Sequence, residues 1–152
     1  MAFEIPKTAY SGKIKEITLG KGDKAVTIGG EATYPFYLFE GEMPQLPKIA
    51  MEVYDSPPEE WPEAALEPFN GVTDDPVAWA KKCIDDYGAE MICLQLLSTD
   101  PNGLDRGADE AAEVVKKVAD AIDVPLVVWG TTNHDKDTEV LRKVAEVCQG
   151  KN

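Results

Sequence analysis

The stretch that decides the fold is residues 91–129, MICLQLLSTDPNGLDRGADEAAEVVKKVADAIDVPLVVW. It begins with a nearly continuous apolar run, 91–97, as is typical of a parallel strand covered on both faces. The turn-rich segment 98–103 follows, and apolar residues at helical spacing then predict a helix over 108–122. A second apolar run, 125–129, predicts another buried strand. This order of elements favours a parallel α/β sheet.

The same order extends along the chain in both directions. Upstream, the apolar run 49–54 predicts a strand, and a long loop with four prolines, 56–75, follows it. A helix is predicted over 75–88, where Asp75 is the N-cap and proline takes the first helical position. Downstream, a last helix is predicted over 135–148. The chain therefore contains three strand–loop–helix units.

The first part of the chain has a different pattern. Two short β-rich runs, 13–19 and 25–28, are joined by a turn that contains glycine and aspartate, which predicts a β-hairpin. An irregular aromatic segment leads from it to Lys48. We therefore divide the chain into residues 1–48, the hairpin and its connecting segment, and residues 49–152, the three βα units.

Three βα units do not close a barrel, which takes eight strands and about 250 residues. Three parallel strands could instead form a small open sheet with exposed strand edges. Two interpretations follow. The chain is a fragment, which we favour, or another copy or another subunit completes it.

Charge and composition exclude several classes of function. The 152 residues carry 28 acidic and 15 basic side chains, a net charge of −13, and all of that excess lies beyond Lys48. Nucleic acids and anionic membranes are therefore not expected partners. Eight acids lie between Glu52 and Asp75 without a single Lys or Arg. They form a solvated face, which we favour, or else a docking surface for a basic partner or an adaptation to a salty cytoplasm.

The length of the apolar runs and the spacing of the cysteines indicate the cellular compartment of the protein. No run reaches the roughly 18 apolar residues of a membrane span, and the N-terminus lacks a secretory signal pattern. Cys83, Cys93 and Cys148 are odd in number and widely spaced, which argues against a disulfide framework and against a metal-binding motif. We expect a cytoplasmic protein with no metal ligands of its own.

Polar side chains follow each predicted strand of the parallel sheet. Ligands of such sheets gather at the carboxyl ends of the strands, so these exits are the expected site. Most of the side chains are uncharged hydrogen-bonding groups suited to amides or a pterin-like ring. The candidates are Asp55, Ser98, Thr99, Thr131, Thr132 and Asn133.

Two other features of these exits have a functional and a structural interpretation. Asp55 and Asp100 follow neighbouring strands and could act as a carboxylate pair, but the segment 100–103 is also simply a good turn. His134, the single histidine, could be an acid–base group, but an exposed residue at a helix start is the favoured interpretation. We assign no catalytic residue.

Several motifs, in order, resemble the small subunit of the corrinoid iron–sulfur protein, which in methanogenic archaea is the delta subunit of the acetyl-CoA decarbonylase/synthase complex. The similarity runs from Lys13 to Asn152, and the archaeal version is the most similar. The motifs are FYLFEGE at 36–42, PKIAMEV at 47–53, DPVAWAKKC at 75–83, YGAE at 87–90, STDPNG at 98–103 and VPLVVWG at 124–130.

The family resemblance implies the first three units of a TIM-barrel-type parallel sheet, an incomplete barrel. It also implies a TIM-barrel subunit that pairs with a larger subunit carrying the corrinoid-binding domain and a 4Fe–4S cluster. Together the two would carry a methyl group on cobalt between a tetrahydropterin methyltransferase and the acetyl-CoA synthase centre. The six candidates above would then hydrogen-bond the amide edge of the corrinoid. The family barrel continues beyond Asn152, so corrinoid contacts from its later strands cannot be assigned here.

Two alternatives stay open. The chain could be a pterin-dependent methyltransferase of a related barrel type, or a fragment with no independent activity. The segment 133–135 does not match Asp-x-His-x-x-Gly, the motif by which many cobalamin modules coordinate cobalt. This agrees with a corrinoid held mainly by a partner.

Overall fold

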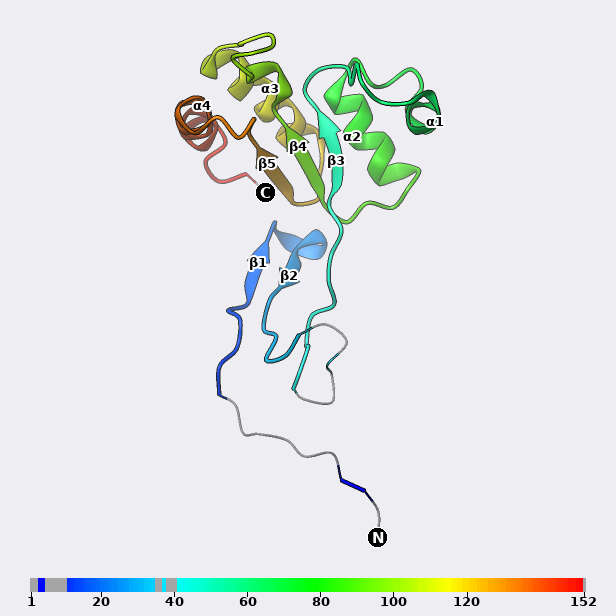
Figure 1. Cartoon of the computed structure of the whole chain (residues 1–152), viewed down its shortest axis with the longest axis vertical. Helices are drawn as coiled ribbons and strands as arrows, with labels where there is room; N and C mark the ends of the chain where they lie inside the picture. Colours follow the sequence, from blue (N-terminus) through cyan, green and yellow to red (C-terminus); the bar gives the residue numbers. More distant parts are fainter. Residues whose placement is uncertain (1–2, 5–10, 35–36, 38–40, 152) are drawn as a thin grey trace.

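The computed structural model describes residues 3–4, 11–34, 37 and 41–151. Four residues of the motif FYLFEGE at 36–42, namely 36 and 38–40, lie outside the described residues. These residues contain two sheets, a two-stranded hairpin and a three-stranded parallel sheet with helices packed against one of its faces (Figure 1). The predicted α/β class and the N-terminal hairpin are confirmed.

The hairpin consists of β1, Ile17–Leu19, and β2, Val26–Ile28, which pair antiparallel. A short 3-10 helix, η1, Gly22–Lys24, lies in the turn between them. The glycines flanking Lys21 have positive φ angles, +77° at Gly20 and +60° at Gly22, which explains why this turn uses glycine.

The parallel sheet has the order β3-β4-β5, with consecutive strands as neighbours. Its strands are β3, Met51–Tyr54, β4, Ile92–Gln95, and β5, Leu126–Trp129. The run at 91–97 was expected to be one strand, but β4 ends at Gln95. The 3-10 helix η3, Leu97–Thr99, then turns the chain away from the sheet.

Helices follow the strands as predicted. They are α1, Glu63–Leu66, η2, Glu67–Phe69, α2, Pro76–Asp85, α3, Ala108–Ala121, and α4, His134–Val147. Asp75 caps α2 as expected, because its carboxylate accepts hydrogen bonds from the backbone N–H groups of Val77 and Ala78 at 2.9 and 3.3 Å.

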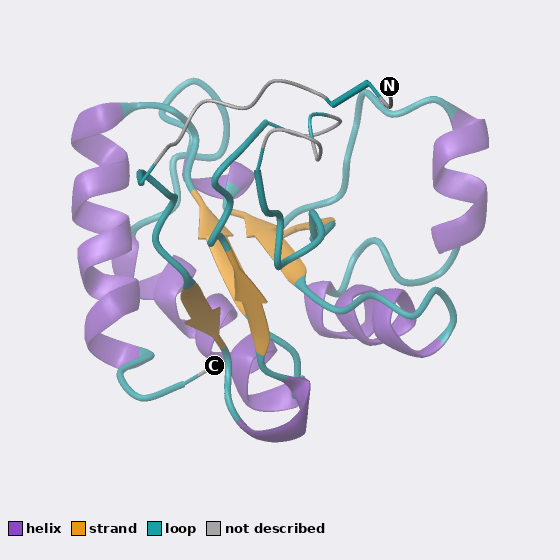
Figure 2. Cartoon of the chain, turned by 90° about the horizontal axis from the view of Figure 1, so that it is seen from below, coloured by secondary structure: helices purple, strands orange, loops and turns teal. Residues whose placement is uncertain are grey.

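The core lies between the helices and one face of the parallel sheet (Figure 2). Val53, Ile92, Leu94 and Leu96 on this face are fully buried. They pack against apolar residues of α2, α3 and α4, among them Trp79. Two consecutive crossovers, through α2 and α3, join the three strands. When successive crossovers advance in one direction with the same right-handed sense, their helices fall on the same side of the sheet, which accounts for this one-sided core.

The hairpin lies at the amino-terminal ends of the parallel strands (Figure 1). Gly20 packs against Pro125, just before β5, so closely that a Cβ at Gly20 would overlap the proline ring. The Lys21 ammonium donates a hydrogen bond to the carbonyl oxygen of Gly150, beyond the end of α4. The hairpin is thus attached to the last third of the chain.

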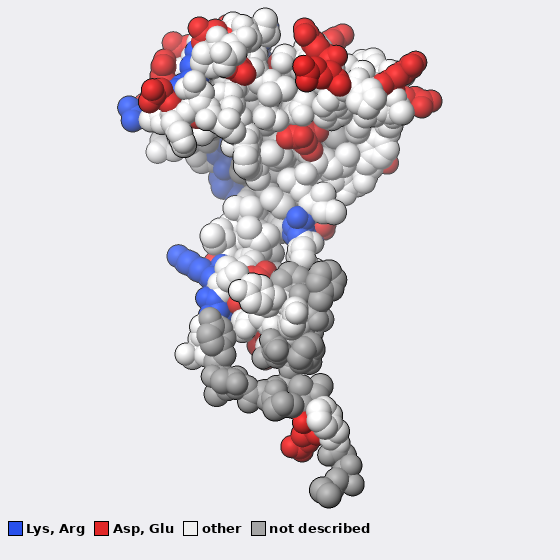
Figure 3. All heavy atoms as spheres, in the orientation of Figure 1, with Lys and Arg blue, Asp and Glu red and all other residues white. Residues whose placement is uncertain are grey.

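Acidic side chains gather over the upper part of the molecule in Figure 3, with some basic side chains among them at the upper left, and further basic side chains lie toward the hairpin. Between β3 and Asp75, the N-cap of α2, the exposed acids are Glu59, Glu60, Glu63, Glu67 and Asp74. Within the described ranges none of these five forms an ion pair. Their exposure agrees with the solvated-face interpretation. Among the described residues, no helix is long and apolar enough to span a membrane.

Candidate functional site

The three parallel strands end at the same edge of the sheet, so the segments after Tyr54, Gln95 and Trp129 are neighbours. This edge, at the top of Figure 1, is called the mouth below and comprises residues 54–56, 95–106 and 129–137. All six predicted site residues lie in it. They differ in burial and in hydrogen-bond partners.

Asp55 and Ser98 are joined directly. The backbone N–H of Ser98 donates to Asp55 Oδ1 at 2.9 Å, and the Ser98 hydroxyl donates to Oδ2 of the same carboxylate. Only 6% of Asp55 and 1% of Ser98 is exposed. Both carboxylate oxygens are therefore used inside the protein, and the pair ties the exit of β3 to the exit of β4.

Burial raises the pKa of Asp55 above its ordinary value, because removal from water disfavours the charged form. The hydrogen bonds from Ser98 and the positive charge of Arg106 act in the opposite direction. Arg106 is also held near the pair through its backbone, whose N–H donates to the Ser98 carbonyl at 2.9 Å. The contacts of Asp55 that the structure describes do not include Asp100, the other member of the possible carboxylate pair.

Thr99 is fully buried, and its hydroxyl donates to the carbonyl oxygen of Leu96 at 2.8 Å. Asp100 accepts the backbone N–H of Asn102 at 2.8 Å, so the favoured turn interpretation of this segment is confirmed. The β4 exit is thus a compact, internally bonded loop.

The β5 exit is more open. The Thr131 backbone N–H and hydroxyl both donate to Asp137 Oδ1, at 2.8 and 3.2 Å. Asn133 caps α4 by accepting the Lys136 backbone N–H at 3.1 Å. Thr132 is exposed and has a φ of +70°, a conformation that is costly for a β-branched residue.

Lys136 links the two loops on that side of the mouth. Its ammonium lies 2.6 Å from Asp105 Oδ1, although the two residues are far apart in sequence. The Lys136 side chain is 16% exposed and the Asp105 side chain 60%, so water reaches the pair from the Asp105 side. The loops after β4 and β5 are therefore connected.

Two residues of the mouth were missed at the sequence level. Gln95 and Trp129 are the last residues of β4 and β5, and they are register partners. They lie on the sheet face opposite the core, and 54% of Trp129 is exposed. The alternation of faces along a strand could have identified them, but continuous apolar runs such as LVVW hide that alternation.

His134 is exposed and is the first residue of α4, as the favoured interpretation predicted. Across the described ranges, no group of three His, Cys, Asp or Glu residues could hold a metal ion. The three cysteines lie on separate elements, in α2, in β4 and after α4.

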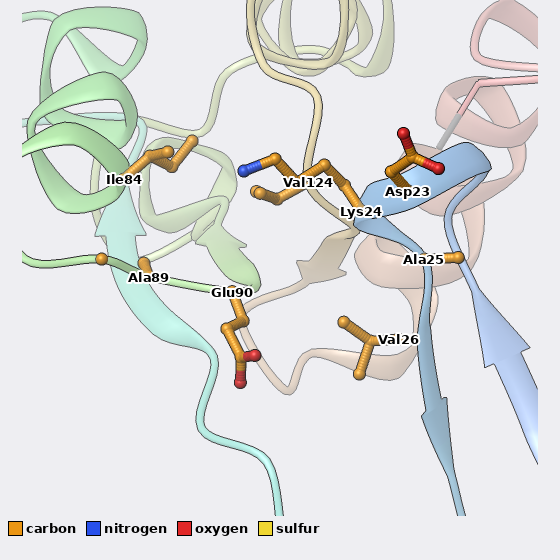
Figure 4. A pocket seen from close by; sticks show the side chains of 9 residues that line it. Asp23, Lys24, Ala25, Val26, Ile84, Ala89, Glu90 and Val124 are labelled. Carbon is orange, nitrogen blue, oxygen red and sulfur yellow. The ribbon is translucent and has the colours of Figure 1, made fainter.

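A cavity of about 210 Å³ lies at the other end of the sheet, between the hairpin and the body (Figure 4). Its walls come from the turn of the hairpin, the end of α2 and the segments just before β4 and β5. The lining residues are Asp23, Lys24, Ala25, Val26, Ile84, Gly88, Ala89, Glu90 and Val124. Because it is at the amino-terminal ends of the strands, it is not part of the mouth.

Comparison with known proteins gives one consistent result. A family model described as the CO dehydrogenase/acetyl-CoA synthase delta subunit matches residues 16–152. The chain is similar to acetyl-CoA decarbonylase/synthase complex subunit delta of Archaeoglobus fulgidus, with 42% identity over 97% of this chain and 34% of the relative. The same subunit of Methanothermobacter thermautotrophicus and of Methanocaldococcus jannaschii is 37% identical, over 97% of this chain and 38% of each relative. The chain thus spans little more than a third of the length of these relatives.

Proposed function

Because the chain belongs to the CO dehydrogenase/acetyl-CoA synthase delta subunit family, we propose that it helps to carry a methyl group on the cobalt of a corrinoid. The methyl group would pass between a tetrahydropterin and the acetyl-CoA synthase centre. The observation that carries this proposal is the family match, which extends over almost the whole chain.

The proposed architecture is the beginning of a TIM barrel. Three features support it: consecutive parallel strands, helices on a single side, and a second sheet face that stays outside the core. On this proposal residues 49–152 contain the first three βα units, and the hairpin, residues 17–28, lies at the amino-terminal end of the barrel.

The mouth would lie against the amide edge of the corrinoid. Thr132 and Asn133 are exposed and uncharged, so their side chains fit hydrogen bonding to amide groups. Thr131 lies beside them, half-buried. Asp55, Ser98 and Thr99 belong to the proposed site as a buried layer behind this surface, since their polar atoms already have partners. When bound, the corrinoid supplies the cobalt that carries the methyl group.

The proposed partners are a larger subunit that carries the corrinoid-binding domain and a 4Fe–4S cluster, together with the methyltransferase and acetyl-CoA synthase components. The wide separation of the cysteines supports a cluster on the partner, since cluster ligands must converge. We place the chain in the cytoplasm, which the three free cysteines support.

A binding experiment tests the proposed larger partner subunit. The purified chain is combined with the corrinoid-bearing subunit of Archaeoglobus fulgidus and cobalamin, and the mass of the complex is measured by light scattering. We expect a heterodimer and a change in the corrinoid absorption spectrum. Without a complex, the proposed partner is wrong.

A matched pair of variants tests the mouth. Thr132→Ala should weaken the spectral change, whereas Thr138→Ala, an exposed threonine on α4, should leave it unchanged. Equal effects of both variants would contradict the proposed surface. Turnover of methyl-tetrahydropterin by the chain alone would instead favour a methyltransferase.

A further inference from the structure

The cavity between the hairpin and the body lies at the opposite end of the sheet from the mouth, and no step of the proposed function uses it. The turn of the hairpin forms one side, and the end of α2 with the segments before β4 and β5 forms the other. Its volume is about 210 Å³. A cavity of about 150 Å³ admits benzene, so this one has room for a benzene-sized body with a small polar group attached.

Much of the cavity wall is apolar. Val26 of the hairpin and Ala89 and Val124 of the body line it, and each is at most 8% exposed. Ala25 and Ile84, which also line it, are half-buried. Walls of this kind, with a few polar groups beside them, are typical of sites for small organic ligands.

One cation in the wall lacks a partner. Figure 4 shows the Lys24 side chain extending from the turn of the hairpin toward Ile84 and Val124. Among the residues that the structure describes, the Lys24 ammonium forms no hydrogen bond and no ion pair. An ammonium beside apolar walls suits an anionic group, with which it forms a charge-assisted hydrogen bond.

The two acids that line the cavity do not neutralise this ammonium. Glu90 is already paired, because its carboxylate lies 2.9 Å from the Lys48 ammonium. The Asp23 carboxylate lies on the other side of the turn from the Lys24 ammonium (Figure 4). The unpaired charge at the cavity is therefore positive.

We propose that the cavity binds a small monocarboxylate with a compact apolar body, about the size of benzoate. The carboxylate pairs with the Lys24 ammonium, and the apolar body packs against Val26, Ala89 and Val124. Lys24 and Val26 belong to the hairpin and the other two residues to the body, so the bound ligand joins the two parts. The inference does not rest on the corrinoid role.

Calorimetric titration of the chain with benzoate tests the site. We expect one benzoate per chain with a dissociation constant of about 1 mM or lower. Benzylammonium carries the opposite charge on a similar ring, and acetate has the carboxylate without the ring. Each should bind at least about fivefold more weakly. No benzoate binding up to about 10 mM, or equal binding of benzylammonium, would overturn the inference.

A matched pair of variants tests the role of the ammonium. Lys24→Met keeps an apolar stem and removes the charge, so benzoate should bind at least about threefold more weakly. Neutral benzyl alcohol should bind this variant as it binds the wild type. Lys117→Met, at an exposed lysine on α3, should leave benzoate binding unchanged. Equal effects of the two variants on benzoate would overturn the inference.

Filling the cavity gives an independent measurement. Val26→Phe places a ring in the space that the ligand would take, and Val26 is not part of the buried cluster of the body. We expect this variant to lose binding of both benzoate and benzyl alcohol. Ile17→Phe enlarges an exposed residue of β1 outside the cavity wall and should bind both as before. Undiminished binding by folded Val26→Phe would overturn the inference, and the Lys24 pair decides it if that variant does not fold.

Hydrogen exchange tests whether the ligand joins the hairpin to the body. At saturating benzoate the backbone amides of β1 and β2 should exchange at least about threefold more slowly, because the ligand binds only the docked hairpin. Amides at the start of α4, at the other end of the sheet, should be unaffected. Protection confined to the mouth would place the ligand there and overturn the inference.

Discussion

Asp55 and Ser98 lie 43 positions apart in sequence, yet the carboxylate of one accepts both the backbone N–H and the hydroxyl of the other. The contact joins the ends of two neighbouring strands in a region that water barely reaches. These hydrogen bonds connect the β3 and β4 exits across the mouth, and single substitutions can test how much they contribute to stability.

We expect Asp55→Ala to lower the free energy of unfolding by about 2–4 kcal/mol, because two buried donors of Ser98 lose their acceptor. Glu59→Ala is the matched control, since this exposed acid follows the same strand. It should change stability by no more than about 0.5 kcal/mol. Urea denaturation measures both, and equal effects would show that the pair contributes nothing.

The raised pKa of Asp55 predicts a pH dependence. The Asp55 carboxyl group holds its proton more tightly in the folded chain than in the unfolded chain, where its pKa is near 3.8. The contribution of the protonated Asp55 to the free energy of unfolding is therefore present in full below pH 3.8. It is lost as the pH rises through the higher pKa of the folded state. The stability of the wild type relative to Asp55→Asn should therefore fall as the pH rises from below 3.8 toward neutrality. Urea titrations at a series of pH values check this, and a relative stability that grows with pH would contradict it.

Thr132→Gly should stabilise the protein by about 0.5–1 kcal/mol, because glycine adopts a φ of +70° without the steric cost that threonine bears. Thr132→Ala keeps a Cβ and should gain less than half as much. Thermal unfolding measures both variants. A loss of stability in the glycine variant would mean that the threonine side chain contributes a contact worth more than the strain.

Gly130→Ala should cost about 2 kcal/mol or more, because a Cβ at this position would overlap the Asp137 carboxylate. The same carboxylate accepts the hydrogen bonds of Thr131, so the entry to α4 would be disturbed. Gly103→Ala is the control, since its Cβ would meet only ordinary contacts at 3.6 Å and beyond. Chemical denaturation of both variants distinguishes a local overlap from a general intolerance of alanine.

Burial raises the pKa of the Cys83 thiol to about 11. At pH 8 only about one thiol in a thousand would be ionised, and the side chain is fully buried. Native protein should therefore leave Cys83 unlabelled by iodoacetamide at pH 8, while urea-unfolded protein reacts at all three cysteines. Mass spectrometry of the labelled peptides checks the prediction, and rapid native labelling would indicate that α2 opens frequently.

Local patterns were enough to predict most of the fold. Asp75 followed by Pro76 located the start of α2, and the two apolar runs located β4 and β5. The end of β4 was misplaced, because Leu96 and Leu97 continue the apolar run while the backbone already turns into η3. Ser98 in that turn bonds to Asp55, 43 residues earlier, and such a contact is not a local feature of the sequence.

The site was predictable in position but not in detail. Strand order alone brings Asp55 and Ser98 together, since their strands are neighbours. That their polar atoms would bind each other requires side-chain positions, which a pattern of residue types does not contain. Gln95 and Trp129 were missed because an uninterrupted apolar run does not reveal which residues face which side.

The attachment of the hairpin has a consequence for the order of events during synthesis. β1 and β2 are close in sequence and can pair as soon as they leave the ribosome. Their anchors, however, are Pro125 and Gly150, which are made more than a hundred residues later. These two contacts of the hairpin can therefore form only after most of the body has emerged. Docking of the hairpin is thus a late step of folding during synthesis. In ribosome-bound chains that stop before Pro125, the hairpin should be open to proteases.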